Sequence, residues 1–184
     1  MVRKLSISKK NLSLILPIVA GVILFDQLSK KLVIDYLQAV GVEQKINNFF
    51  NLVLIKNTGM GFGFLQDYHL PPLIIIFLTA LVALVALVVF WGANGLRLKV
   101  ALSIALAGGI SNGVDRVVHG GVIDFLDFHY GNFHWPSFNF ADSAISIAIF
   151  LLFLEIISND GRRKHRINRS GRSRSTRRSM QKRR

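Results

Sequence analysis

The sequence predicts an all-α membrane protein with four transmembrane helices, accompanied by a small outer-face β-cradle and an interfacial segment. Hydrophobic residues make up 51% of the 184-residue chain, and they form long blocks instead of alternating as around the core of a soluble domain. Basic residues are concentrated near the two ends, and a short strand-like run lies between the first two apolar blocks. These observations favour a helix bundle in lipid with one small β element.

The most apolar block spans residues 70–91, which are 22 residues without a charged side chain. A helix of about 20 apolar residues crosses the hydrocarbon core of a bilayer, which is about 30 Å thick. Residues 12–36, 100–118 and 140–157 form three further blocks with polar interruptions. We interpret the first of these as a retained helix, because its apolar region is longer than that of a cleaved signal peptide.

The distribution of charge predicts the orientation of the four spans. The formal net charge is +13, and twelve Lys or Arg side chains lie within residues 162–184. The loop before the third span holds Arg97 and Lys99, whereas the loops 37–69 and 119–139 hold only Lys45 and Lys56. The positive-inside rule therefore places both termini in the cytoplasm.

Two regions follow from this pattern. Residues 1–160 form the predicted membrane domain, and residues 161–184 form a basic, Ser-rich tail without apolar periodicity, which predicts disorder. Such a tail can bind nucleic acid or acidic partners. Attraction to anionic lipid, about 1 kcal/mol per basic residue near the surface, is the more common use. We therefore expect lipid contacts for the tail and no nucleic acid.

The polar residues with a candidate role lie near those ends of the apolar blocks that the topology makes the outer ends. Asp26 and Lys30 are four residues apart with the acid first, the favoured order for an ion pair on a helix. Such a pair either holds helices together or takes part in chemistry, and the spacing leaves both roles open.

Asn112, Asp115 and Arg116 have helical spacing and predict a polar edge on the third span. Such a network is scaffold as often as chemistry, because buried charges need partners merely to be tolerated. Small residues on the same span predict close approach of neighbouring helices: Gly108, Gly109 and Gly113.

The fourth span begins with a capping signal. Asn139 followed three residues later by Asp142 resembles a capping box, in which each side chain accepts a hydrogen bond from a backbone N–H group. A carboxylate in the first turn also lies at the positive end of the helix dipole, which favours its ionised form. Asp124 follows the third span in the outer loop.

The first outer loop contains a short apolar run, residues 49–55, that is typical of a strand. From Asn57 to Phe64, glycine and large apolar residues then alternate, so one face of an extended chain is bare and another backbone can approach it. An extended substrate peptide could pair with this edge, although a Gly-rich loop without a ligand explains the pattern equally well.

The second outer loop is rich in aromatic residues, which predicts an interfacial segment lying flat on the membrane. Its histidines, His119, His129 and His134, lack the spacing of a metal-binding motif. The chain has no Cys, which excludes thiolate ligands, thiolate nucleophiles and disulfides. No metal or other cofactor is predicted.

Four short motifs, in order on the predicted spans, resemble the lipoprotein signal peptidases, the bacterial signal peptidase II family. The resemblance covers about residues 12–158. The motifs are Asp26-Gln27-Leu28-Ser29-Lys30; Asn57-Thr58-Gly59; Asn112-Gly113-Val114-Asp115-Arg116 with Gly121-Val122-Ile123-Asp124-Phe125; and Phe138-Asn139-Phe140-Ala141-Asp142.

The resemblance implies an aspartic endopeptidase of the bacterial inner membrane, active at the outer face. Its substrates would be prolipoproteins, cut before a Cys that carries diacylglycerol. The resemblance implies Asp124 and Asp142 as the catalytic pair, and we expect a monomer. The implied supporting and substrate-binding positions are Asp26, Lys30, Asn57, Gly59, Asn112, Asp115, Arg116 and Asn139.

Two departures from the family's usual pattern concern packing and substrate fit instead of the reaction. Met60-Gly61 stands where two Ala are usual, and Ser111 stands where Gly is usual. The reaction itself follows from carboxyl chemistry, because two close carboxylates share a proton and can act as base and acid in peptide hydrolysis. Asp142 is the expected base because it starts a helix.

Two other function classes explain parts of the pattern. A small ion-coupled carrier also places acids inside helices, but its sites lie near the bilayer midplane and internal repeats are usual. A non-catalytic membrane scaffold that docks partners explains the basic tail and leaves the acids unexplained. The acids of this chain collect at one end of the spans, which favours the peptidase.

Overall fold

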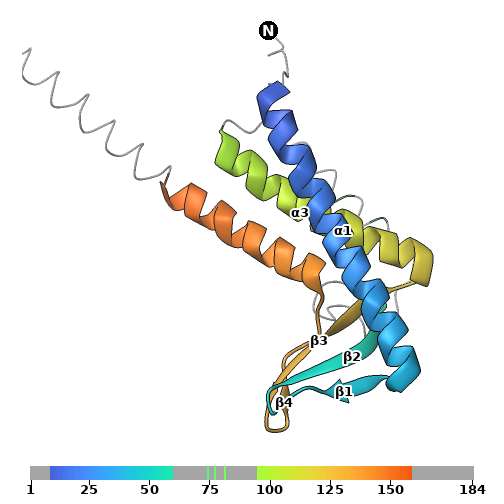
Figure 1. Ribbon diagram of the computed structural model, residues 1–184. Helices are drawn as coiled ribbons and strands as arrows, with labels where there is room; N and C mark the ends of the chain where they lie inside the picture. Colours follow the sequence, from blue (N-terminus) through green and yellow to red (C-terminus); the bar gives the residue numbers. More distant parts are fainter. Residues whose placement is uncertain (1–8, 60–73, 75–76, 78–80, 82–94, 159–184) are drawn as a thin grey trace, which may run out of the picture.

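The computed structural model describes residues 9–59, 74, 77, 81 and 95–158. In this part of the chain, three long helices lie above a small antiparallel sheet (Figure 1). The helices are α1 (Lys9–Val40), α3 (Leu96–His119) and a helix over Phe140–Ser158. The strands are β1 (Glu43–Lys45), β2 (Phe50–Asn57), β3 (Val122–Tyr130) and β4 (Phe133–His134).

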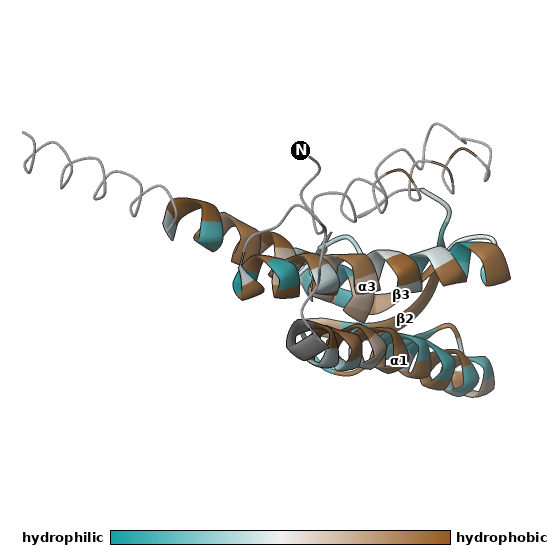
Figure 2. Cartoon of the chain, turned by 90° about the horizontal axis from the view of Figure 1, so that it is seen from above, coloured by the Kyte–Doolittle hydropathy of each residue, from teal (hydrophilic) through white to brown (hydrophobic). Residues whose placement is uncertain are grey.

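The helices turn apolar side chains outward. Leu12–Val40 and Phe140–Ser158 are long and apolar enough to cross a membrane, and only 11% of the most apolar window of each is buried. Figure 2 shows that hydrophobic residues predominate along these helices. The core helix of a soluble protein would bury this surface, so lipid is the contact that fits Phe25 and Phe150, both 60% exposed.

The sheet has the strand order β1-β2-β3-β4, and all neighbours are antiparallel. The predicted strand over residues 49–55 is confirmed as β2. The pairing of β2 with β3 contains a bulge, because Leu52 pairs with Leu126 but Ile55 pairs with Asp124. A two-residue turn that begins at Gly131, with φ at 58°, connects β3 to β4.

Asp124 lies within β3, a strand that the sequence did not predict in the segment between α3 and the helix over Phe140–Ser158. This strand is aromatic-rich and buries five of its first six residues, so it lacks the alternation of polar and apolar residues that indicates a strand. Its pairing with β2, far away in the sequence, supplies the order that the local pattern does not show.

Two glycines position the elements around the site. Gly120, with φ at 70°, ends α3 in the left-handed conformation and turns the chain into β3. The predicted close packing is confirmed at Gly108, where an added Cβ would lie 2.6 Å from the carbonyl oxygen of Ala141. It is not found at Gly109 or Gly113, where an added Cβ meets no described atom within 4 Å.

Several predictions concern residues outside the described part of the chain. These are most of the second span, residues 70–91, the glycine-alternating run after Gly59, and the basic tail over residues 161–184. Within the second span, residues 74, 77 and 81 are helical.

Candidate active site

The structure brings Asp124 and Asp142 together around the side chain of Asn139. Nδ2 of Asn139 donates to Oδ1 of Asp124 at 2.7 Å, and Oδ1 of Asn139 accepts the backbone N–H of Asp142 at 2.9 Å. Asn139 is fully buried and Asp124 is only 2% exposed. One buried amide therefore links the strand that carries one aspartate to the helix that carries the other.

Local sequence explains the position of Asp142. The carboxylate of Asp142 accepts the N–H of Asn139 at 3.4 Å, while the Asn139 side chain accepts the N–H of Asp142. The predicted capping box is thus confirmed. Asp142 also accepts a hydrogen bond from Nδ2 of Asn112 at 2.8 Å, which ties the first turn of its helix to α3.

Contacts between distant parts of the chain hold Asp124. Nδ2 of Asn57, which is 67 residues away in sequence, donates to Oδ2 of Asp124 at 2.9 Å. Burial raises the pKa of Asp124 to about 7, and the negative charge of Asp142 acts in the same direction. The hydrogen bonds from Asn57 and Asn139 and the charge of Lys30 lower the pKa, but they do not offset burial.

Asn112 connects the aspartate pair to a buried cation. Its Oδ1 accepts hydrogen bonds from Nζ of Lys30 at 3.0 Å and from Nδ2 of Asn139 at 3.2 Å. An ammonium group can only donate, so Lys30 fixes the orientation of the Asn112 amide. The amide nitrogen consequently faces Asp142 as a donor.

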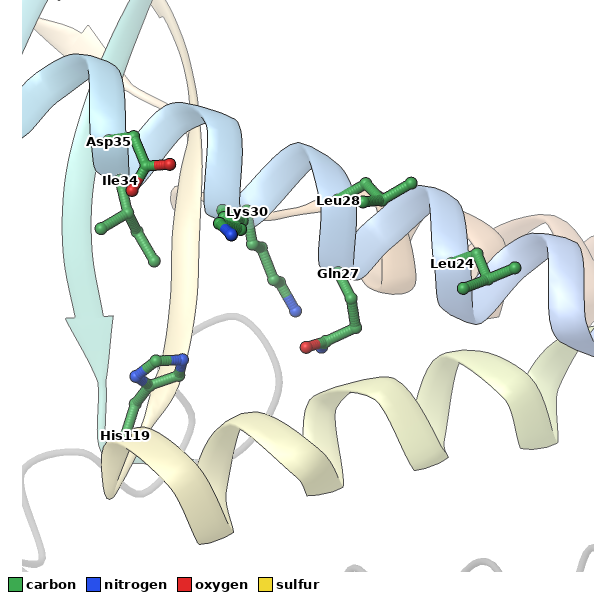
Figure 3. Close-up of a pocket in the computed structure, with 8 residues that line it drawn as sticks. Leu24, Gln27, Leu28, Lys30, Ile34, Asp35 and His119 are labelled. Atoms are coloured by element: carbon green, nitrogen blue, oxygen red, sulfur yellow. The ribbon is translucent and has the colours of Figure 1, made fainter.

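Lys30 lies between two carboxylates. Its Nζ is 2.7 Å from Oδ2 of Asp26 and 2.7 Å from Oδ2 of Asp115, and all three side chains are buried. The predicted pair of Asp26 with Lys30 is confirmed, and Asp115 extends it to α3. Figure 3 shows the side chains of Lys30 and Gln27 pointing from α1 toward α3.

Gln27 and Ser111, which were not predicted to have a functional role, complete this network. Nε2 of Gln27 donates to Oδ1 of Asp115 at 2.8 Å and to Oγ of Ser111 at 3.0 Å. Oγ of Ser111 donates to Oδ2 of Asp26 at 2.7 Å. Helical spacing was the available signal, because Gln27 lies three residues before Lys30 and Ser111 four before Asp115.

Arg116 holds the end of β2. Its Nη2 donates to the carbonyl oxygen of Gly59 at 3.1 Å and its Nη1 to that of Asn112 at 3.2 Å, while the N–H of Gly59 donates to Oδ1 of Asn57. No described hydrogen bond joins Arg116 to either carboxylate, and its expected role as a supporting residue of the aspartate pair stays a prediction. The contacts of Arg116 reach the pair through Gly59 and Asn57, and its buried Nε has no described partner.

The histidines take no part in the hydrogen bonds of the aspartate pair. Nδ1 of His134 is 2.9 Å from the carboxylate of Asp127, and the ring of His134 stacks on that of His129 with centroids 5.0 Å apart. His119 lines a groove of about 460 Å³ between α1 and α3, beside Lys30 (Figure 3). Within the described residues, no group of three or more His, Asp or Glu could hold a metal ion.

The fold and the site define a helical membrane protein with two asparagine-linked aspartates, Asp124 buried and Asp142 half-buried, at the junction of its helices and a small sheet. The model of a family described as signal peptidase (SPase) II matches residues 18–158. The chain belongs to the signal peptidase (SPase) II family. This confirms the resemblance predicted from the four motifs, and with it the class of enzyme, a peptidase.

Similar proteins agree with this assignment. The chain is 40% identical over 141 residues to a lipoprotein signal peptidase of Paraburkholderia phytofirmans, covering 73% of this chain and 78% of that protein. It is 38% identical over 156 residues to one of Syntrophus aciditrophicus, covering 81% and 95%. A solved structure described as a bacterial membrane enzyme has a TM-score of 0.62 at 28% identity, covering 80% of this chain and 90% of that one.

Proposed function

We propose that this chain removes signal peptides from prolipoproteins by hydrolysing the peptide bond before a diacylglyceryl-modified Cys, with Asp124 and Asp142 activating the attacking water. The name of the relatives, lipoprotein signal peptidase, supports the substrate class. The observation that carries the catalytic assignment is Asn139, whose side chain donates to Asp124 and caps the helix at Asp142.

Asp142 is the proposed base. Its two oxygens accept hydrogen bonds from Nδ2 of Asn112 and from the N–H of Asn139, which is the arrangement that suits the acceptor-only carboxylate form. In that form it takes a proton from a water molecule while the water oxygen attacks the scissile carbonyl carbon.

Asp124 is the proposed acid. Burial raises the pKa of Asp124 to about 7, so Asp124 can hold a proton at a pH where an ordinary carboxyl group has lost it. It donates this proton to the carbonyl oxygen, which gives a gem-diol. As the C–N bond breaks, the amine takes the proton that Asp142 received, and Asp124 recovers a proton from a diol hydroxyl.

The proposal includes four spans, at residues 12–36, 70–91, 100–118 and 140–157, in the bacterial inner membrane with both termini cytoplasmic. The basic residues at the two ends and the apolar surfaces of α1 and Phe140–Ser158 support this topology. The aspartates then lie at the outer boundary, where the lipid tails of the substrate stay in the leaflet while its scissile bond meets water. We further propose a monomer whose tail, residues 161–184, contacts anionic lipid.

The test is cleavage of a diacylglyceryl-modified prolipoprotein by the purified protein in lipid. Asp124→Asn and Asp142→Asn should each lower kcat by about 1,000-fold or more, because each removes one proton-transfer group. Asp127→Asn, on the same strand as Asp124, is the matched control and should keep at least about a third of the activity. Full activity in either folded Asp124 or Asp142 variant would refute the aspartate mechanism.

A further inference from the structure

The chain segments that carry the two proposed catalytic aspartates each donate a backbone N–H group to a buried carboxylate. Oδ1 of Asp26 accepts the N–H of Ala141 at 2.8 Å, and Oδ2 of Asp115 accepts the N–H of Ile123 at 3.1 Å. Ala141 immediately precedes Asp142 and Ile123 immediately precedes Asp124. Each catalytic segment is therefore held, one residue before its aspartate, by a carboxylate from another element.

A single cation joins the two holding carboxylates. Nζ of Lys30 lies 2.7 Å from Asp26 and 2.7 Å from Asp115, and the three residues are 2%, 0% and 1% exposed in that order. Because solvent does not reach these groups, the positions of the two carboxylates are set by Lys30 and by the neighbouring donors Gln27 and Ser111.

We propose that Lys30 is a positioning residue that, with Asp26 and Asp115, forms an ionic clamp setting the separation of the backbone segments that carry Asp124 and Asp142. The inference rests on the proposed function and adds to it the groups that fix the geometry of the aspartate pair. The chain of contacts runs from Ala141 through Asp26, Lys30 and Asp115 to Ile123.

Stability alone does not account for this triad. Replacing a buried ionic triad by uncharged residues of similar volume is often neutral or stabilising, because the charges must be removed from water. A neutral amide offers one acceptor oxygen where each carboxylate uses two. Asp26 accepts the N–H of Ala141 with one oxygen and Ser111 and Lys30 with the other, and Asp115 divides Gln27 from Ile123 and Lys30 in the same way. Positioning is sensitive to small errors, since a displacement of about 1 Å can lower a rate by about 100-fold.

The neutral triple variant Asp26→Asn, Lys30→Gln, Asp115→Asn separates positioning from stability. It keeps the side-chain volumes and leaves no unpaired buried charge, so it should fold. Its kcat and KM for a diacylglyceryl-modified prolipoprotein should be compared with those of the wild type, together with the thermal unfolding of both proteins in the same lipid. Lys31→Gln is the control, because Lys31 is exposed beside Lys30 and has no described ion pair.

The clamp predicts a folded triple variant whose kcat is lower by at least about tenfold with KM within about threefold, and a Lys31→Gln variant like the wild type. A folded triple variant with kcat within about threefold of wild type would overturn the clamp, and so would one that fails to fold, because the triad would then serve stability. Wild-type cleavage and the Asp124→Asn variant, measured in the same series, report on the proposed function separately. Absence of wild-type cleavage would overturn that function and the clamp with it.

Discussion

Two Asn–Asp hydrogen bonds of the same kind connect β2 to β3. Near the helices, Nδ2 of Asn57 donates to Asp124, and toward the β3–β4 turn, Nδ2 of Asn51 donates to Asp127, both at 2.9 Å. The two aspartates differ in their other neighbours. Asp127 contacts His134, whose side chain is 51% exposed, whereas Asp124 contacts the buried Asn139 and feels the charge of Asp142.

A hydrogen bond from an Asn side chain therefore does not by itself decide whether an aspartate can act in the reaction. The imidazole of His134 contacts Asp127 and can balance its charge when protonated, and solvent reaches this imidazole. No described cation contacts Asp124 directly, so the cost of burying its charge is only partly offset and its pKa rises to about 7. The environment beyond the Asn–Asp pair therefore separates the proposed catalytic aspartate from a structural one.

The largest expected effect of a single amide is that of Asn139→Ala. The change removes the donor to Asp124 and the cap of the helix that carries Asp142, so kcat should fall by about 100-fold or more. Thermal unfolding should show the loss of a cap, about 1 kcal/mol. Asn47→Ala, which removes an exposed hydrogen bond between the Asn47 side chain and the N–H of Phe49, should leave cleavage unchanged. An Asn139→Ala variant with more than about a tenth of wild-type kcat would contradict the role of this side chain.

The pH dependence should follow Asp124. Since the acid must be protonated, kcat should fall about tenfold per pH unit above pH 7, as Asp124 ionises with its raised pKa of about 7. The folded pKa lies above the value of about 3.9 in the unfolded chain. The contribution of Asp124 to stability is thus fully present below about pH 4 and is lost as the pH rises through 7.

Rate profiles and thermal unfolding between pH 5 and pH 9 check both statements. Asp124→Asn removes the titrating group and should flatten the part of the stability profile that lies near pH 7. A wild-type rate that keeps rising above pH 8 would exclude Asp124 as the acid.

Asn57→Ala and Asn51→Ala compare the two cross-strand contacts directly. Loss of the Asn57 amide removes a donor that favours the ionised form of Asp124, so its pKa should rise and the alkaline fall in rate should move to higher pH. The rate at neutral pH should fall by about tenfold, the size expected for one lost hydrogen bond to a charged group. Asn51→Ala should leave the pH profile in place, and equal profile shifts in both variants would remove the distinction.

The smallest effect is expected for His134→Ala. A half-exposed ion pair contributes about 0–1 kcal/mol, so thermal stability should change little and cleavage should stay within about twofold of wild type. A loss of more than about tenfold would show that the outer end of the sheet takes part in the reaction.

The spacing of residues along the sequence predicted the contacts that form within a single helix or at its cap. The pairs Asp26–Lys30 and Asn139–Asp142 were predictable because residues three or four apart meet on a helix or at its cap. The resemblance to a family supplied Asp124, since its approach to Asp142 depends on the folding of β3 against β2. Neither spacing nor composition indicated that Asp124 lies in a strand.

The contacts that the sequence did not predict join distant segments through the backbone. Asp26 reaches Ala141 across 115 residues, and Asp115 accepts the N–H of Ile123 beyond the turn at Gly120. Backbone N–H groups carry no residue-specific signal, so only the folded chain identifies which of them a carboxylate will hold. Arg116 follows the same pattern, because its partners are two carbonyl oxygens.

Asn112 is followed directly by Gly113, the step at which asparagine deamidates most readily, because the unhindered glycine nitrogen can attack the side-chain amide. In α3 the helical backbone keeps that nitrogen away from the attacking geometry. If α3 opened locally, conversion of Asn112 to aspartate would replace the donor that faces Asp142 with a carboxylate oxygen. The time over which the enzyme keeps its activity, as distinct from its rate, therefore depends on how rarely this turn of α3 opens.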